Sequence, residues 1–156
     1  MTNSDHRNGF TLVEILTAVS IIGLLAVFII PAYILAVRNR QNAQVANQLN
    51  TAVLAFELYA AETGGYPATK GSGATPPEMA DYYFPYFKID WWGNTNELGG
   101  RWGWNNGGSF KRSVSIASPT VSTNQLIELD KLVDDGNLSS GKFRQVGTQY
   151  HYIIEQ

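Results

Sequence analysis

Cysteine is absent from this chain, so a disulfide, a thiolate nucleophile and a cysteine-ligated metal are all excluded. Histidine is scarce, with His6 near the N-terminus and His151 between two tyrosines near the C-terminus. These two do not have metal-ligand spacing, and no serine, histidine and aspartate set indicates nucleophilic catalysis. The formal net charge of −2 gives no indication of a nucleic-acid-binding surface. We therefore predict that the protein is not an enzyme and does not bind nucleic acid.

Charge is also missing from one long stretch, because the run from Ile15 to Val37 contains no charged residue. Such a run is long enough to cross a bilayer as one helix. A secretory signal peptide has an apolar region of only about 7–15 residues, which is shorter than this run. An ordinary signal anchor stays an alternative, although it has no need of the carboxylate of Glu14 at its edge. Ionisable residues in membrane segments are usually kept for a partner.

A short polar leader, Met1 to Gly9, precedes this run, and the junction reads Gly9-Phe10-Thr11-Leu12-Val13-Glu14. The combination of this junction, Glu14 and the apolar run resembles the N-terminus of the type IV pilin-like family. That family includes pilins, type II secretion pseudopilins and competence pseudopilins. The resemblance implies that prepilin peptidase cuts between Gly9 and Phe10 and that Phe10 becomes the methylated N-terminus. Glu14 would then be the fifth residue of the mature chain and would act in assembly with other pilin-like subunits.

The resemblance divides the chain into a leader (1–9), a transmembrane helix (10–37) and an extracytoplasmic head (38–156). It places the leader in the cytoplasm of a bacterium and the head in the periplasm or beyond. The positive-inside rule favours the reverse orientation, because Arg38 and Arg40 follow the apolar run. We expect the orientation of the family, since its cut occurs on the cytoplasmic face.

Two residues weaken the apolar helix, Gly23 by its low helix propensity and Pro31 by removing a backbone hydrogen bond. A kink is expected near Val27 to Pro31. Both positions match the family, in which the segment between them can lose helical structure inside the assembled filament. Glycine and proline are also common in membrane helices in general, which is the alternative explanation.

Apolar residues continue at helical spacing beyond the membrane run, and the opposite face is polar. Val45, Leu49, Val53 and Phe56 lie on the apolar face, and Gly64-Gly65 is expected to end the helix. The sequence after it predicts a short helix from Pro77 to about Tyr83 and a hairpin turn at Asn105 to Gly108. It also predicts a return strand over 110–116, a helix from Ser122 or Thr123 to about Val133, and strands over 142–146 and 149–154. The predicted fold is α+β and pilin-like: a long N-terminal helix packed on a small antiparallel sheet, with an additional short helix.

Oxygen-bearing side chains gather after the predicted helix that ends near Val133. Asp134, Asp135, Asn137 and Ser139 form a cluster of the ligand type that calcium prefers. Major type II pseudopilins bind calcium in a C-terminal loop, but this cluster lacks EF-hand spacing and a bidentate glutamate. A helix end followed by a turn explains the same residues without a metal, so both interpretations stay open.

Four tryptophans, Trp91, Trp92, Trp102 and Trp104, lie in the predicted head. Trp102 and Trp104 are two residues apart and share one face of a strand. We expect them to pack against the long helix, and the alternative is an exposed aromatic platform for a glycan or polymer.

We interpret the chain as a membrane-anchored structural subunit of a type II secretion pseudopilus. The alternatives are a type IV pilus subunit and a membrane-anchored glycan-binding or polymer-binding protein. The expected partners are other pilin-like subunits, prepilin peptidase, the inner-membrane assembly platform and membrane lipid.

Overall fold

The computed structural model describes residues 10–156. The described residues divide into two compact units, one up to Val37 and one from Arg38 to Gln156. The predicted leader, with Gly9, lies outside the described residues. The first helix, α1, spans Leu12–Thr63 and contributes residues to both units.

In the first unit, the described residues form the apolar beginning of α1. Its large apolar side chains are exposed along the run, with Leu16 at 62% and Phe28 at 72%. Gly23 and Pro31 both lie within the helix, which is not interrupted at either residue. Among the described residues, α1 is the one helix that is long and apolar enough to cross a membrane. The loss of helix between Gly23 and Pro31 in a filament stays a prediction.

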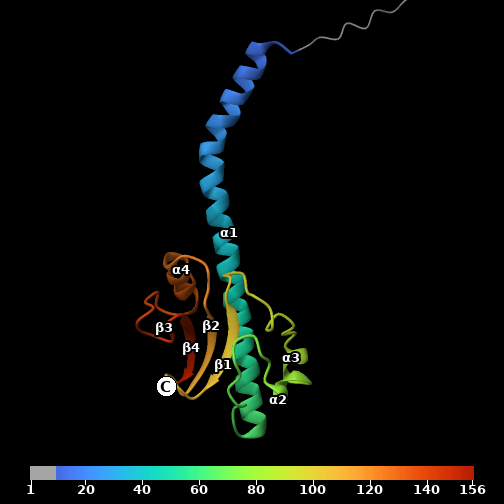
Figure 1. Cartoon of the computed structure of the whole chain (residues 1–156), viewed down its shortest axis with the longest axis vertical. Coiled ribbons are helices and arrows are strands. Elements are labelled where there is room, and N and C mark those ends of the chain that lie inside the picture. The colour runs from blue at the N-terminus through green and yellow to red at the C-terminus, as the bar shows by residue number, and fades with distance from the viewer. Residues whose placement is uncertain (1–9) are drawn as a thin grey trace, which may run out of the picture. The chain divides into compact units, whose positions relative to one another are not determined.

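The second unit combines the rest of α1 with a four-stranded sheet, as Figure 1 shows. The strand order is β1-β2-β4-β3 and every neighbouring pair is antiparallel. The strands are β1 (Arg101–Asn106), β2 (Arg112–Ala117), β3 (Phe143–Val146) and β4 (Gln149–Glu155). The helices after α1 are α2 (Pro77–Ala80), α3 (Tyr83–Tyr86) and α4 (Thr123–Val133).

The β1–β2 hairpin brings its large apolar residues to one face of the sheet. Trp102 lies opposite Ile116 and Trp104 opposite Val114, and all four side chains are fully buried. Gly107 and Gly108 begin the turn with φ of 106° and 97°, a conformation that glycine adopts without strain. Because side chains alternate along a strand, Ser113, Ser115 and His151 lie on the other face.

Phe56 of α1 sits at the centre of the head's core. Its ring stacks on Trp104 with centroids 3.8 Å apart and planes 9° apart. It also contacts Phe84 edge-on at 6.0 Å and Trp92 at 5.7 Å. The helix therefore joins the sheet to the segment that carries α2 and α3. The other fully buried residues of α1 in this core are Val45, Leu49, Ala52 and Ala55.

Hydrogen bonds attach α4 to α1 at the edge of this core. Asn42, itself 1% exposed, donates its amide to the Gln125 carbonyl at 3.3 Å. The Gln125 side chain donates to Gln41 at 3.1 Å and to Asn42 at 3.4 Å. The Ser122 hydroxyl accepts from the Gln125 amide and caps the helix, as its sequence predicts.

Loops cover both outer edges of the sheet. The amides of Lys70 and Gly73 donate to the β1 carbonyls of Trp104 and Trp102, at 3.2 and 2.6 Å. On the opposite edge, the β3 amide of Gln145 donates to the Leu138 carbonyl at 2.8 Å.

The α+β fold class predicted from the sequence is confirmed, with the long helix, the antiparallel sheet and the additional short helices in place. The details differ at three points, the first of which is that Asn105 and Asn106 belong to β1 and not to the turn. The helix expected from Pro77 to about Tyr83 ends at Ala80, and a separate turn of helix begins at Tyr83. The return strand begins at Arg112, because Phe110 belongs to the turn.

Phe56→Ala tests the packing of the helix on the sheet. We expect the head to lose about 3–5 kcal/mol of unfolding free energy, because a fully buried aromatic side chain is removed. Unfolding of the full chain in detergent can be followed by tryptophan fluorescence, since all four tryptophans lie in the head. Leu54→Ala is the control, because Leu54 lies on the same helix and is 55% exposed. Equal stability of the two variants would show that the buried face of α1 has been assigned wrongly.

Candidate functional site

Glu14 begins the helix by making a reciprocal cap with Thr11. The Thr11 amide and hydroxyl both donate to Glu14 Oε2 at 2.8 Å, and the Glu14 amide donates to the Thr11 hydroxyl at 3.2 Å. This is a capping box, which satisfies amides that the first turn of a helix leaves without partners. Within its own chain, the carboxylate is therefore bonded to backbone and hydroxyl groups.

Phe10 precedes this cap and is 83% exposed. The predicted cleavage junction lies between it and Gly9, which is outside the described residues. The Phe10 side chain is therefore exposed to solvent just before the helix begins. The cut and the methylation stay predictions.

A second candidate site lies where α4 ends. Carboxylate oxygens of Asp130, Asp134 and Asp135 lie within 4.8 Å of one another. Asp130 is on the helix, Asp134 caps its C-terminus and Asp135 follows. The sequence prediction named Asp134 and Asp135 but missed Asp130. The spacing of four residues between Asp130 and Asp134 is the signal that places both on one side of a helix.

Asp130 is the unusual member of this group. The residue is 0% exposed, and neither carboxylate oxygen has a hydrogen-bond partner among the described residues. Burial, followed by the nearby charges of Asp135 and Asp134, raises the pKa of Asp130 to about 6. The backbone amide of Gly136 lies near enough to lower this pKa, although it makes no hydrogen bond of normal geometry with the carboxylate. A buried carboxylate without a partner is costly, so this position favours a proton or a bound cation.

The loop after α4 holds the other two carboxylates in place. Asp134 accepts from the backbone amides of Lys142 and Phe143, the latter at 3.2 Å. Asp135 accepts from the Asn137 amide at 2.8 Å and from the Ser140 hydroxyl at 2.9 Å. A Cβ at Gly141 would collide with the Asp134 carboxylate, so only glycine allows this close approach.

The remaining residues of the predicted calcium set take part in turn hydrogen bonds. Asn137 accepts from the Ser139 amide at 3.1 Å, and both residues are exposed. The carboxylates that the structure brings together are therefore Asp130, Asp134 and Asp135. All three are hard oxygen donors of the kind that calcium binds.

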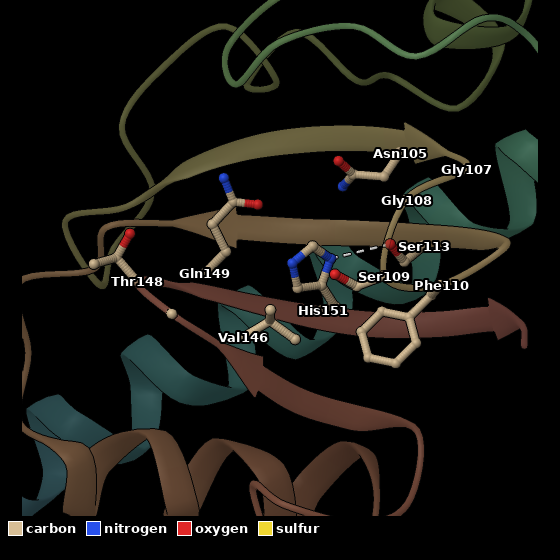
Figure 2. A pocket seen from close by; sticks show the side chains of 11 residues that line it. Asn105, Gly107, Gly108, Ser109, Phe110, Ser113, Val146, Thr148, Gln149 and His151 are labelled. Carbon is tan, nitrogen blue, oxygen red and sulfur yellow. Dashed lines mark hydrogen bonds between the residues drawn. The ribbon is translucent and has the colours of Figure 1, made fainter.

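A cavity of about 450 Å³ lies on the face of the sheet opposite α1, and Figure 2 shows its lining. His151 Nδ1 lies 3.1 Å from the Ser113 hydroxyl, and the Phe110 ring lies against the imidazole with centroids 5.5 Å apart. Ser113 is 1% exposed, and burial lowers the pKa of His151. No carboxylate is among the described residues that line the cavity. This serine and histidine thus form a buried hydrogen bond without the features of a catalytic set.

The tryptophans are part of the core. Trp92, Trp102 and Trp104 are at most 1% exposed, and Trp91 is half-buried against Trp102. The Nε1 atoms of Trp92 and Trp104 donate to the carbonyls of Ala74 and Pro67, each at 3.0 Å. The alternative of an exposed tryptophan platform for a glycan is therefore wrong.

Comparison with known families finds one match, which covers residues 4–30 and describes the prokaryotic N-terminal methylation motif. No curated protein and no solved structure matches the chain. The matched segment contains the predicted junction, Glu14 and the beginning of the apolar helix. It is a prepilin-type signal. The chain therefore combines this signal with an α+β pilin-like layout, the features of a type IV pilin-like protein.

Proposed function

We propose that this protein is a structural subunit of a type II secretion pseudopilus, a filament that serves protein export. The observation that carries the proposal is the N-terminal methylation motif at residues 4–30, followed by the apolar helix and an α+β head. The absence of cysteine favours a pseudopilin over a type IV pilin, since many of those pilins carry a disulfide near the C-terminus. A type IV pilus subunit is the second reading.

In this proposal, the apolar part of α1 anchors the subunit in the cytoplasmic membrane and later packs against other subunits. The leader faces the cytoplasm and the head faces the periplasm or the outside. The subunit is cut by prepilin peptidase and inserted into the filament by the inner-membrane assembly platform. Its role is mechanical, and neither the serine–histidine pair nor the cavity around it has a catalytic part.

We propose two roles for Glu14 in such a subunit, one within its own helix and one between subunits. It completes the cap with Thr11 in its own helix. In a filament, it would also pair with the N-terminal amine of a neighbouring Phe10. A charge pair shielded from water is stronger than an exposed one and fixes the axial register of two subunits. Because insertion into lipid needs apolar length alone, we propose that Glu14 selects the neighbour and is dispensable for insertion.

Processing is the first test. We expect prepilin peptidase to remove Met1 to Gly9 and to leave a methylated Phe10, because glycine presents no side chain to the peptidase. Gly9→Val should leave the precursor uncut. Intact-mass measurement of the membrane-extracted protein decides the matter. A mature chain that still starts at Met1, or a cut elsewhere, would contradict the assignment.

Assembly is the second test, with variants of Glu14 and Thr11. Glu14→Ala should be inserted and cut normally but should fail to enter sheared or detergent-released filaments, and Glu14→Asp should be intermediate. Thr11→Ala is the matched control, because it removes both hydroxyl hydrogen bonds of the cap while keeping the carboxylate and the bond from the backbone amide of residue 11. We expect Thr11→Ala to enter filaments. If both alanine variants fail equally, Glu14 acts through its cap, and wild-type incorporation of Glu14→Ala would remove the pairing argument.

We also propose that the carboxylates of Asp130, Asp134 and Asp135 hold a calcium ion. The specific observation is that Asp130 is fully buried with both oxygens unpartnered among the described residues. A divalent cation would supply the countercharge that these oxygens lack. It would thereby tie the end of α4 to the beginning of β3, whose Phe143 amide already bonds Asp134.

Calcium titration of the thermal unfolding of the full chain in detergent tests this proposal. Saturating calcium should raise the melting temperature, since a ligand at about 100 times its Kd stabilises a protein by about 2.7 kcal/mol. Asp130→Asn should abolish the calcium effect while the protein stays folded, because the buried charge is removed. Asp81→Asn, at an exposed aspartate, is the control and should keep the effect. Equal calcium responses of wild type and Asp130→Asn would exclude this site.

A further inference from the structure

Asn137, Leu138 and Ser139 form a sequence motif in the middle of the loop between α4 and β3. An asparagine followed two residues later by serine or threonine, with any residue except proline between them, is the acceptor motif of N-glycosylation. Asn137 is the one asparagine in the whole sequence with a serine or threonine at that spacing. Use of the motif requires an exposed loop, because the attached saccharide is bulky and hydrated.

The structure meets this requirement. The loop leaves α4 at Asp134 and returns as β3 at Phe143, and Figure 1 shows it at the margin of the head. Asn137 and Ser139 are both exposed, while Leu138 between them is half-buried and packs against the core. The leucine therefore anchors the middle of the motif, and the two polar residues stay open to solvent.

The hydrogen bonds of Asn137 use every polar group except the atom that N-glycosylation modifies. Its side-chain oxygen accepts from the Ser139 amide at 3.1 Å, and its backbone amide donates to Asp135 at 2.8 Å. Its carbonyl accepts from the Ser140 amide at 2.9 Å. Because a backbone amide only donates, the bond from Ser139 identifies the accepting side-chain atom as Oδ1. Among the described residues, neither Nδ2 of Asn137 nor the Ser139 hydroxyl has a hydrogen-bond partner.

Resting on the proposed function, which places the head outside the cytoplasm, we propose that Asn137 carries an N-linked saccharide. The donor is a saccharide held on a lipid diphosphate, and a membrane-bound transferase of the same cell catalyses the transfer. Nδ2 forms a bond to the anomeric carbon, the bond from that carbon to the phosphate oxygen breaks, and Nδ2 loses one proton. The lipid diphosphate leaves with the electron pair of the broken bond. The Ser139 hydroxyl, which serine and threonine share, is the group that marks the acceptor.

The loop can carry this group without a change of its path. Asp134 ties its two ends together, because its carboxylate accepts from the amides of Lys142 and Phe143. The exposed Asn137 side chain lies outside this tie, so the saccharide extends into solvent. A bulky, hydrated group cannot be buried between subunits. The modification therefore places the loop between α4 and β3 on the outer surface of the filament.

Mass spectrometry of the full chain, extracted from the membranes of its native cells, tests the proposal. Trypsin cuts after lysine and arginine, so it releases residues 132–142 as one peptide, whose only asparagine is Asn137. We expect this peptide to carry an added mass that equals a whole number of saccharide residues. An unmodified peptide from the wild-type chain would overturn the proposal.

Variants of the motif separate this site from other modifications of the same peptide. Asn137→Gln and Ser139→Ala should each lose the added mass, since one removes the acceptor atom's residue and the other removes the hydroxyl. Ser139→Thr should retain the added mass, because threonine keeps the hydroxyl. Ser140→Ala is the matched control and should retain it, since Ser140 lies in the same turn but outside the motif. An added mass that survives Asn137→Gln would place the saccharide on a serine hydroxyl and would overturn the proposal.

The same cells distinguish failure of this proposal from failure of the proposed function. A chain that is cut, methylated and present in filaments but unmodified at Asn137 rejects the saccharide alone. A chain that carries the saccharide but never enters filaments supports the modification and rejects the proposed function. Intact filaments are also treated with periodate and a hydrazide label, which should mark wild-type filaments and leave Asn137→Gln filaments unmarked. Label that enters the wild type only after the filaments are dissociated would contradict the outward position of the loop.

Discussion

The stack of Phe56 on Trp104 is the contact on which the head depends. It joins a helix to a sheet through two flat rings 3.8 Å apart, and the same phenyl ring reaches Phe84 and Trp92. Three segments distant in sequence therefore meet at one side chain. With cysteine absent, no covalent link between side chains supports this arrangement. The free energy of the head comes from burying these rings and the aliphatic residues around them.

Much of the fold followed from local patterns in the sequence. The apolar face of Val45, Leu49 and Phe56 predicted the packing side of the long helix, and Asn105 to Gly108 predicted the hairpin. Both features depend on the helical period and on turn chemistry, which involve only residues that are close together in the sequence. The local pattern did not predict the break between Ala80 and Tyr83, on either side of which Met79 and Phe84 are buried in the core.

The candidate sites show the same division. The junction at Gly9 and Phe10 and the carboxylate of Glu14 form a linear motif, so the sequence alone predicts them, and their roles stay predictions. The cap between Thr11 and Glu14 needed coordinates, although its spacing of three residues was visible. The sequence did not predict Asp130 as a site residue, because a charged side chain beside an apolar helix face is expected to turn toward water. The structure buries it beside Asp134 and Asp135, whose carboxylate oxygens lie within 4.8 Å of its own.

The covered edges of the sheet have a consequence for crowding. An open strand edge offers unpaired amides and carbonyls that can pair with another chain. In this head, Lys70 and Gly73 bond one outer strand and Leu138 bonds the other. Many copies of the head can therefore be held close together without their sheets fusing into a continuous β-structure. Neighbouring heads are left to meet through side chains, and a contact of that kind can be released when a filament is taken apart.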